Sequence, residues 1–111
     1  MVVLARDENR VPIQGMFSNV ALEETYDATV SASTEIVLNA STTFIEVTAN
    51  AKPIFMKWGT SDVSSTDFDS IIPQDSTRGF KVPLDTSTGA LFTAVNFIEQ
   101  AATATLAVIE Y

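Results

Sequence analysis

Few residues in this chain could do chemistry. It contains no histidine and no cysteine, so Ser-His and Cys-His nucleophile pairs and cysteine-based metal sites cannot form within one chain. A Ser-Lys pair would have to use Lys52, Lys57 or Lys81, and the spacing favours none of them. The four glycines are isolated, so a phosphate-binding loop is not expected either. The sequence therefore predicts a protein that is not an enzyme, with no catalytic residue and no cofactor, although a composite site shared between subunits would escape this argument.

The aspartates between residues 62 and 75 are the remaining candidates for ligand binding. Asp67 and Asp69 lie two apart, which on a strand places both on one face, and Asp62 and Asp75 are near in sequence. Carboxylate oxygens are ligands for Ca²⁺, but this spacing matches no EF-hand loop. We interpret these aspartates as turn-forming, solubilising residues and predict no metal site.

Trp58 is the only tryptophan. An exposed tryptophan could stack on a sugar ring, which makes a host-glycan-binding module one alternative for the function. Its spacing from Ile54 and Met56 instead places it on the inner face of a strand. The pattern therefore favours a core or interface position for Trp58.

Length and composition predict one folded domain. The chain has 111 residues, of which 46% are hydrophobic and 18% charged, and its net charge is −8. This acidic balance disfavours binding to nucleic acid or to an anionic membrane. The apolar start at residues 1–5 is interrupted by Arg6, so we expect neither a signal peptide nor a membrane-spanning helix.

The elements that must position these residues are short strands. From Asp27 onward Thr, Val, Ile, Phe and Ser dominate, and residues 43–50 alternate between apolar and polar with a period of two. Further strands are expected at residues 34–39, 54–60, 68–73, 77–83, 90–98 and 103–111, with the clearest turn at 85–89. Residues 91–107 could also be drawn as a helix, but their β-branched and aromatic content favours strands. The fold class predicted is all-β: an antiparallel β-sandwich or jelly-roll-like barrel formed by residues 27–111.

Residues 1–26 lack this alternation, and we interpret them as an extended N-terminal arm with at most one short strand. The arm carries a charged patch and several large apolar side chains that need burial, either on its own domain or on a neighbouring subunit. The interface residues that we predict are Arg6, Asp7, Arg10, Val11, Ile13, Met16 and Phe17 of the arm, together with Trp58.

Two stretches resemble small β-rich structural proteins of tailed bacteriophages. Residues 5–12 (ARDENRVP) are similar to the A-x-R-D-x-N-x-V-P opening of small virion proteins, and residues 54–60 (IFMKWGT) are similar to a Y-V-K-F-G-T strand. The segments IIP at residues 71–73 and FKVP at 80–83 continue the same pattern.

This resemblance implies a virion protein, assembled in the host bacterial cytoplasm, that acts as a capsid decoration, cement or auxiliary head protein without catalysis. Its partners would be the major capsid protein, other virion proteins and copies of itself. For a homo-oligomer closed cyclic symmetry is expected, and we favour a trimer. We expect no nucleic acid and no membrane among the partners.

Overall fold

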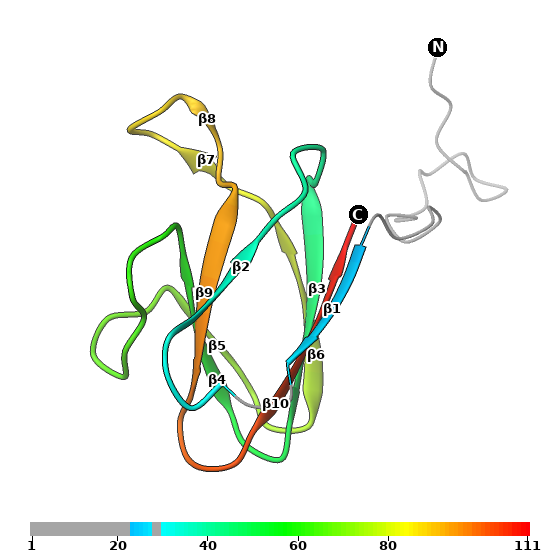
Figure 1. The fold of residues 1–111 in the computed structure, drawn as a ribbon, viewed down its shortest axis with the longest axis vertical. Helices are drawn as coiled ribbons and strands as arrows, with labels where there is room; N and C mark the ends of the chain where they lie inside the picture. The colour runs from blue at the N-terminus through cyan, green and yellow to red at the C-terminus, as the bar shows by residue number, and fades with distance from the viewer. Residues whose placement is uncertain (1–22, 28–29) are drawn as a thin grey trace, which may run out of the picture.

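The computed structural model describes residues 23–27, for their backbone only, and residues 30–111. The described chain is all-β, and every strand pair is antiparallel. Sheet I has the strand order β1 (Glu23–Asp27), β10 (Thr105–Glu110), β3 (Phe44–Asn50), β6 (Ser76–Lys81). Sheet II has the order β2 (Thr34–Val37), β9 (Ala94–Glu99), β4 (Ile54–Trp58), β5 (Ser70–Ile72). A separate hairpin of β7 (Leu84–Asp85) and β8 (Ala90–Leu91) projects from one end (Figure 1).

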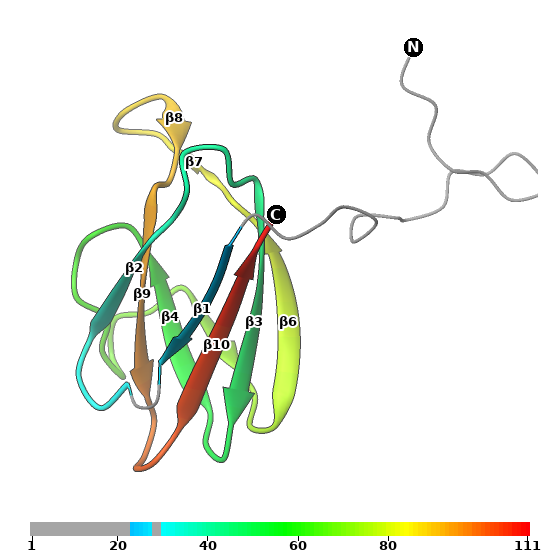
Figure 2. The same ribbon diagram turned by 45° about the vertical axis from the view of Figure 1, so that its right-hand side comes forward.

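The two four-stranded sheets pack face to face as a sandwich (Figure 2). If the β7–β8 hairpin is set aside, the connections between successive strands cross from one sheet to the other. The one exception is the connection from β4 to β5, which stays within sheet II. This order is that of a double Greek key, the jelly roll. The predicted all-β fold class is confirmed. Of the two predicted architectures, the strand order is that of the jelly roll, and it is formed by two open sheets rather than by a closed barrel.

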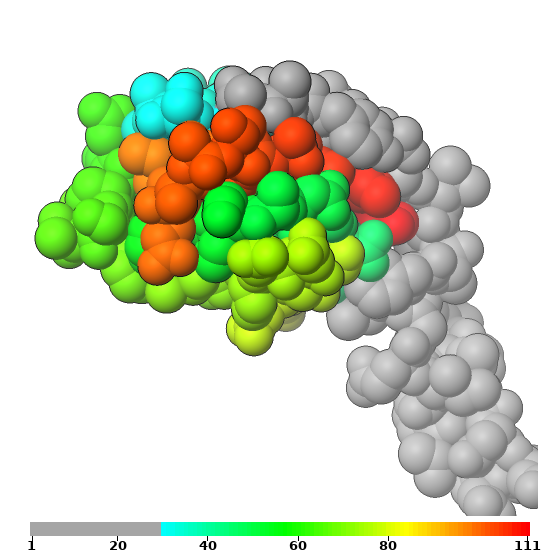
Figure 3. Space-filling model, turned by 90° about the horizontal axis from the view of Figure 1, so that it is seen from below, coloured from blue at the N-terminus to red at the C-terminus, as the bar shows by residue number. Residues whose placement is uncertain are grey.

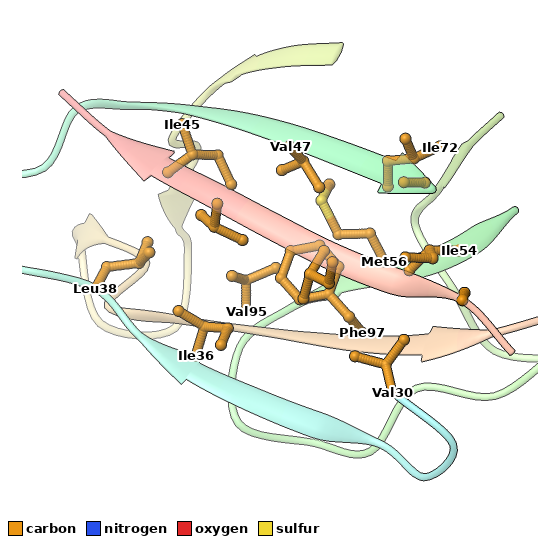
Figure 4. Close-up of a cluster of buried hydrophobic side chains, with 14 of the residues drawn as sticks. Val30, Ile36, Leu38, Ile45, Val47, Ile54, Met56, Ile72, Val95 and Phe97 are labelled. Carbon is orange, nitrogen blue, oxygen red and sulfur yellow. The ribbon is translucent and has the colours of Figure 1, made fainter. Parts of the chain in front are cut away.

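The core lies between the sheets because alternate residues of each strand face inward. In β3 the inward residues Ile45, Val47 and Ala49 are fully buried, as their spacing predicts. Side chains from sheet II meet them across the sandwich (Figure 4). The cluster of buried residues comprises Val30, Ile36, Leu38, Ile45, Val47, Ala49, Ile54, Met56, Ile72, Val82, Val95, Phe97, Ala104, Leu106 and Val108.

Part of the outer face of sheet II is covered by the loop of residues 59–69. Phe55 points away from the core, yet it is only 6% exposed, because Phe68 of the loop packs on it with ring centroids 4.7 Å apart. Asn96 is buried on the same face, where its Nδ2 donates to the Gly59 carbonyl at 2.9 Å. Sheet II is therefore buried on both faces over part of its area.

The turns at the end of the sandwich opposite the β7–β8 hairpin are tied to one another. The backbone N–H of Ala51, between β3 and β4, donates to Oδ1 of Asp75, between β5 and β6, at 2.9 Å. The N–H of Gln100, after β9, donates to the Pro53 carbonyl at 2.9 Å. Figure 3 shows this end, where the three connections lie side by side.

The predicted strand boundaries need three changes. Residue 26, the predicted end of the arm, lies inside β1, because β1 pairs with β10 over all of its residues. The expected strand at 90–98 is divided between β8 and β9, and that at 68–73 shrinks to β5. The strand interpretation of residues 91–107 is confirmed by β9 and β10.

Candidate functional site

Trp58 belongs to an aromatic cluster at the hairpin end of the core. Its ring lies 6.2 Å from that of Phe92, with 28° between the ring planes, and 6.5 Å from the ring of Phe80, nearly perpendicular to it. All three side chains are partly buried and pack against the core. The predicted inward placement of Trp58 is confirmed. Because Phe92 lies against it, Trp58 is a packing residue with limited free ring surface.

The aspartates of the loop at residues 59–69 fasten the loop to β4. Oδ2 of Asp67 forms an ion pair of 2.7 Å with Nζ of Lys57. Oδ2 of Asp69 accepts a hydrogen bond of 2.8 Å from the Trp58 N–H, and the N–H of Asp69 donates to the Met56 carbonyl at 2.7 Å. These contacts agree with the structural interpretation of the aspartates.

Two findings concern sites and membranes in the described part of the chain. Residues 23–27 and 30–111 contain no group of three or more Asp and Glu side chains placed to hold a metal ion together. Within the same residues there is no helix with the length and apolar character needed to cross a bilayer.

The β7–β8 hairpin presents an exposed apolar pair. Leu84 and Leu91 are direct cross-strand partners, and they are 55% and 40% exposed. The turn between them is held by Asp85, whose Oδ1 accepts hydrogen bonds from the Ser87 N–H at 2.9 Å and the Ser87 hydroxyl at 2.7 Å. Gly89 completes the turn with a φ of 75°, a conformation that suits glycine. The leucine pair is thus displayed on a well-ordered turn, which lowers the entropy cost of binding a partner.

Sequence reasoning found the turn at 85–89 but not the importance of the residues beside it. The signal was present, since two leucines flank that turn at positions that a hairpin brings together. Two other exposed apolar residues, Phe68 and Ile71, lie on the loop and on β5, while Val37 at the end of β2 is 69% exposed.

The structure also reveals a buried carboxyl group that the sequence analysis did not single out. Glu110 is fully buried at the end of β10, on the inward face that Leu106 and Val108 also occupy. Its Oε1 accepts hydrogen bonds of 2.7 Å from the Asn39 N–H and from the Thr42 hydroxyl. The alternation of the last strand was the signal that could have found it.

The other predicted interface residues, Arg6, Asp7, Arg10, Val11, Ile13, Met16 and Phe17, lie outside the described residues. Their role at an interface stays a prediction. No family model, no curated protein and no solved structure matches this chain.

Proposed function

We propose that this chain is a structural protein of a bacteriophage virion, a decoration, cement or auxiliary head protein that binds the capsid or neighbouring subunits without catalysis. The context comes from the resemblance of residues 5–12 and 54–60 to small virion proteins. The jelly-roll topology adds a fold-level analogy, because viral capsid domains use it, as do lectin domains. A fold alone does not determine a function, so the proposal depends on a surface that can bind.

The observation that carries the proposal is the exposed Leu84–Leu91 pair on the β7–β8 hairpin. An apolar pair on a rigid projecting turn suits insertion into a hollow of another protein, where burial of apolar area supplies the binding free energy. In this proposal the partner is the major capsid protein or another virion protein, and the arm adds further apolar contacts with it. Self-association, for which we favour a trimer, increases the avidity of binding.

Cosedimentation with empty capsids of the phage whose genome carries the sequence tests the proposal. The full-length protein should sediment with the capsids, and the variant Leu84→Ser/Leu91→Ser should bind at least about tenfold more weakly. Val37→Ser removes an even more exposed apolar side chain from β2 and is the control, with binding expected to be unchanged.

Two results would contradict the proposal. One is a full-length protein that stays in the supernatant at every capsid concentration. The other is an equal loss of binding in the hairpin variant and in the Val37→Ser control, which would show that the hairpin has no special role.

A further inference from the structure

The two edge strands of sheet I carry opposite charges. β1 and β6 lie at opposite ends of the strand order β1-β10-β3-β6 (Figure 2). The five residues of β1, EETYD, include three carboxylates, whereas β6, STRGFK, contains Arg78 and Lys81 and no acidic residue. Arg78 and Lys81 are both exposed. Among the described residues the only ion pair is that between Lys57 and Asp67, so it involves neither of these two cations. As far as the described residues show, the cations on β6 are therefore available to a partner.

The hydrogen-bond pattern shows which backbone groups of β6 face outward. The N–H of Val82, directly after β6, donates to the Thr43 carbonyl at 2.9 Å, so this pair is a hydrogen-bonded one. In an antiparallel ladder hydrogen-bonded pairs recur at every second residue. Phe80 and Arg78 therefore bond to β3, and the residues whose backbone groups point to the open side of β6 are Thr77, Gly79 and Lys81.

The same argument applies to β1. Phe44 and Tyr111 exchange hydrogen bonds in both directions, at 3.2 and 2.8 Å, which makes them a hydrogen-bonded pair between β3 and β10. By alternation Glu110, Val108 and Leu106 direct their backbone groups to β1. The residues of β1 whose backbone groups point to its open side are Glu24 and Tyr26.

The two open edges match in direction and in register. Because sheet I has an even number of antiparallel strands, β1 and β6 run in opposite directions. When one copy is rotated beside another about an axis along the strands, β1 of the first therefore meets β6 of the second as an antiparallel pair. The outward backbone groups of the two strands can be aligned so that Glu24 lies opposite Lys81. The same alignment places Asp27 opposite Arg78. A shift of two residues either way loses both acid–base pairs.

We propose that copies of this chain associate head to tail through these edges, with β1 of one copy paired to β6 of the next in the register Glu24–Lys81. The kind of partner is thus a second copy, and sheet I becomes continuous between subunits. Such a contact joins two different surfaces and closes into a ring when the rotation between copies permits it. It is a property of the chain alone and does not depend on a place in a virion.

Charge makes this contact selective. Arg6 and Arg10 balance Asp7 and Glu8, so the whole net charge of −8 belongs to the rest of the chain. Most contacts between two such bodies bring like charges together, which opposes association. The β1–β6 contact is favoured because it sets carboxylates against two of the chain's six Lys and Arg residues.

Edge protection is the competing explanation for the cations of β6, because charged side chains on an edge strand also serve to prevent pairing. The two explanations predict opposite effects of neutralisation. If Arg78 and Lys81 attract β1, the variant Arg78→Thr/Lys81→Thr should associate on the order of tenfold more weakly than the wild type. If they only block the edge, the variant should associate more strongly.

Sedimentation velocity over micromolar to millimolar protein concentrations measures this difference. Lys52→Thr, which neutralises a cation of the β3–β4 turn, is the matched control and should leave association unchanged. Three results would overturn the proposal: a wild type that is monomeric throughout, stronger association of the β6 variant, or equal losses in the variant and in the control.

A crosslinking experiment tests the register independently of charge. The chain has no cysteine, so Asp27→Cys and Arg78→Cys each introduce a single thiol. In the proposed register these positions form a non-hydrogen-bonded pair with Cα atoms about 4.5 Å apart, within disulfide reach. A mixture of the two variants, mildly oxidised, should give a disulfide-linked dimer, and each variant alone should give little. A dimer from either variant alone would show a symmetric contact and would contradict the head-to-tail arrangement. A mixture of Thr25→Cys and Arg78→Cys tests the register. Efficient crosslinking of that mixture would contradict the proposed register.

Discussion

The Thr42 hydroxyl donates a hydrogen bond of 2.7 Å to Oε1 of Glu110, and both side chains are buried. The Asn39 N–H donates to the same oxygen, so the last strand holds the β2–β3 connection through one carboxyl group. The other oxygen, Oε2, is buried and has no hydrogen-bond partner among the described residues. This contact links residues far apart in sequence at one end of the core.

Replacing Glu110 should therefore destabilise the protein by an amount that depends on the substitute. Glu110→Ala leaves the buried Thr42 hydroxyl and the partly buried Asn39 N–H without their acceptor and opens a cavity, so we expect a loss of about 3 kcal/mol in the free energy of unfolding. Glu110→Gln keeps an acceptor oxygen at the same place, and the loss should stay within about 1 kcal/mol. Urea denaturation measures both, with Glu46→Gln on the outer face of β3 as control. Equal losses for Ala and Gln would show that the hydrogen bonds contribute little.

Asn96 should help to hold the loop of residues 59–69 against sheet II, together with Asp67 and Asp69. Its Oδ1 accepts from the Ser33 hydroxyl at 3.1 Å and its Nδ2 donates to the Gly59 carbonyl. Asn96→Asp replaces that donor with an oxygen facing a carbonyl oxygen, and we expect a loss of about 2 kcal/mol or more. Limited proteolysis should then cleave the loop faster than in the wild type. Asn50→Asp, an exposed change of the same kind, should leave both stability and the cleavage rate unaltered.

Trp58 should contribute to the stability of the fold, independently of any ligand. Trp58→Ala removes a ring that packs on Phe92 and Phe80, and we expect a loss of about 2–3 kcal/mol, below the range for a fully buried tryptophan because Trp58 is only partly buried. Trp58→Phe retains an aromatic ring and should cost less. Thermal unfolding measures both variants. The glycan-binding alternative stays a prediction, and a glycan array would test it best with Trp58→Phe as the folded control.

Ala51→Gly should stabilise the protein. Ala51 adopts a φ of 75° in the β3–β4 turn, where an L-residue with a Cβ is strained. The residue is exposed, so the substitution loses little packing, and relief of strain should exceed the added entropy of the unfolded chain by about 0.5 kcal/mol. Ala40→Gly, at an exposed turn position without positive φ, should instead be destabilising. A lower unfolding midpoint for Ala51→Gly would refute this account.

The strands of this fold could be predicted because alternation is a local property. β3 shows it best, since every second residue enters the core. The burial of Phe55 and Asn96 could not be predicted, because both point away from the core and are covered by a loop whose path depends on contacts distant in sequence. The same holds for β1, whose place was set by pairing with β10 rather than by its own pattern.

The candidate surfaces were less predictable than the fold. Trp58 was placed correctly, because its register with Ile54 and Met56 is read directly from the strand. The Leu84–Leu91 pair required knowledge of the hairpin register, and the charged edges of sheet I required the strand order. Neither is visible in a sequence until the pairing is known.

The pairing of β1 with β10 also constrains how the chain folds during synthesis. Glu23 lies opposite Glu110, so the first strand of the described chain pairs with a strand that is synthesised much later. Long-range pairing of this kind slows folding, because a large loop must close before the contact is gained. We expect sheet I to be completed only after β10 has emerged from the ribosome, and until then the edge of the nascent chain that will receive β10 is open to binding by chaperones.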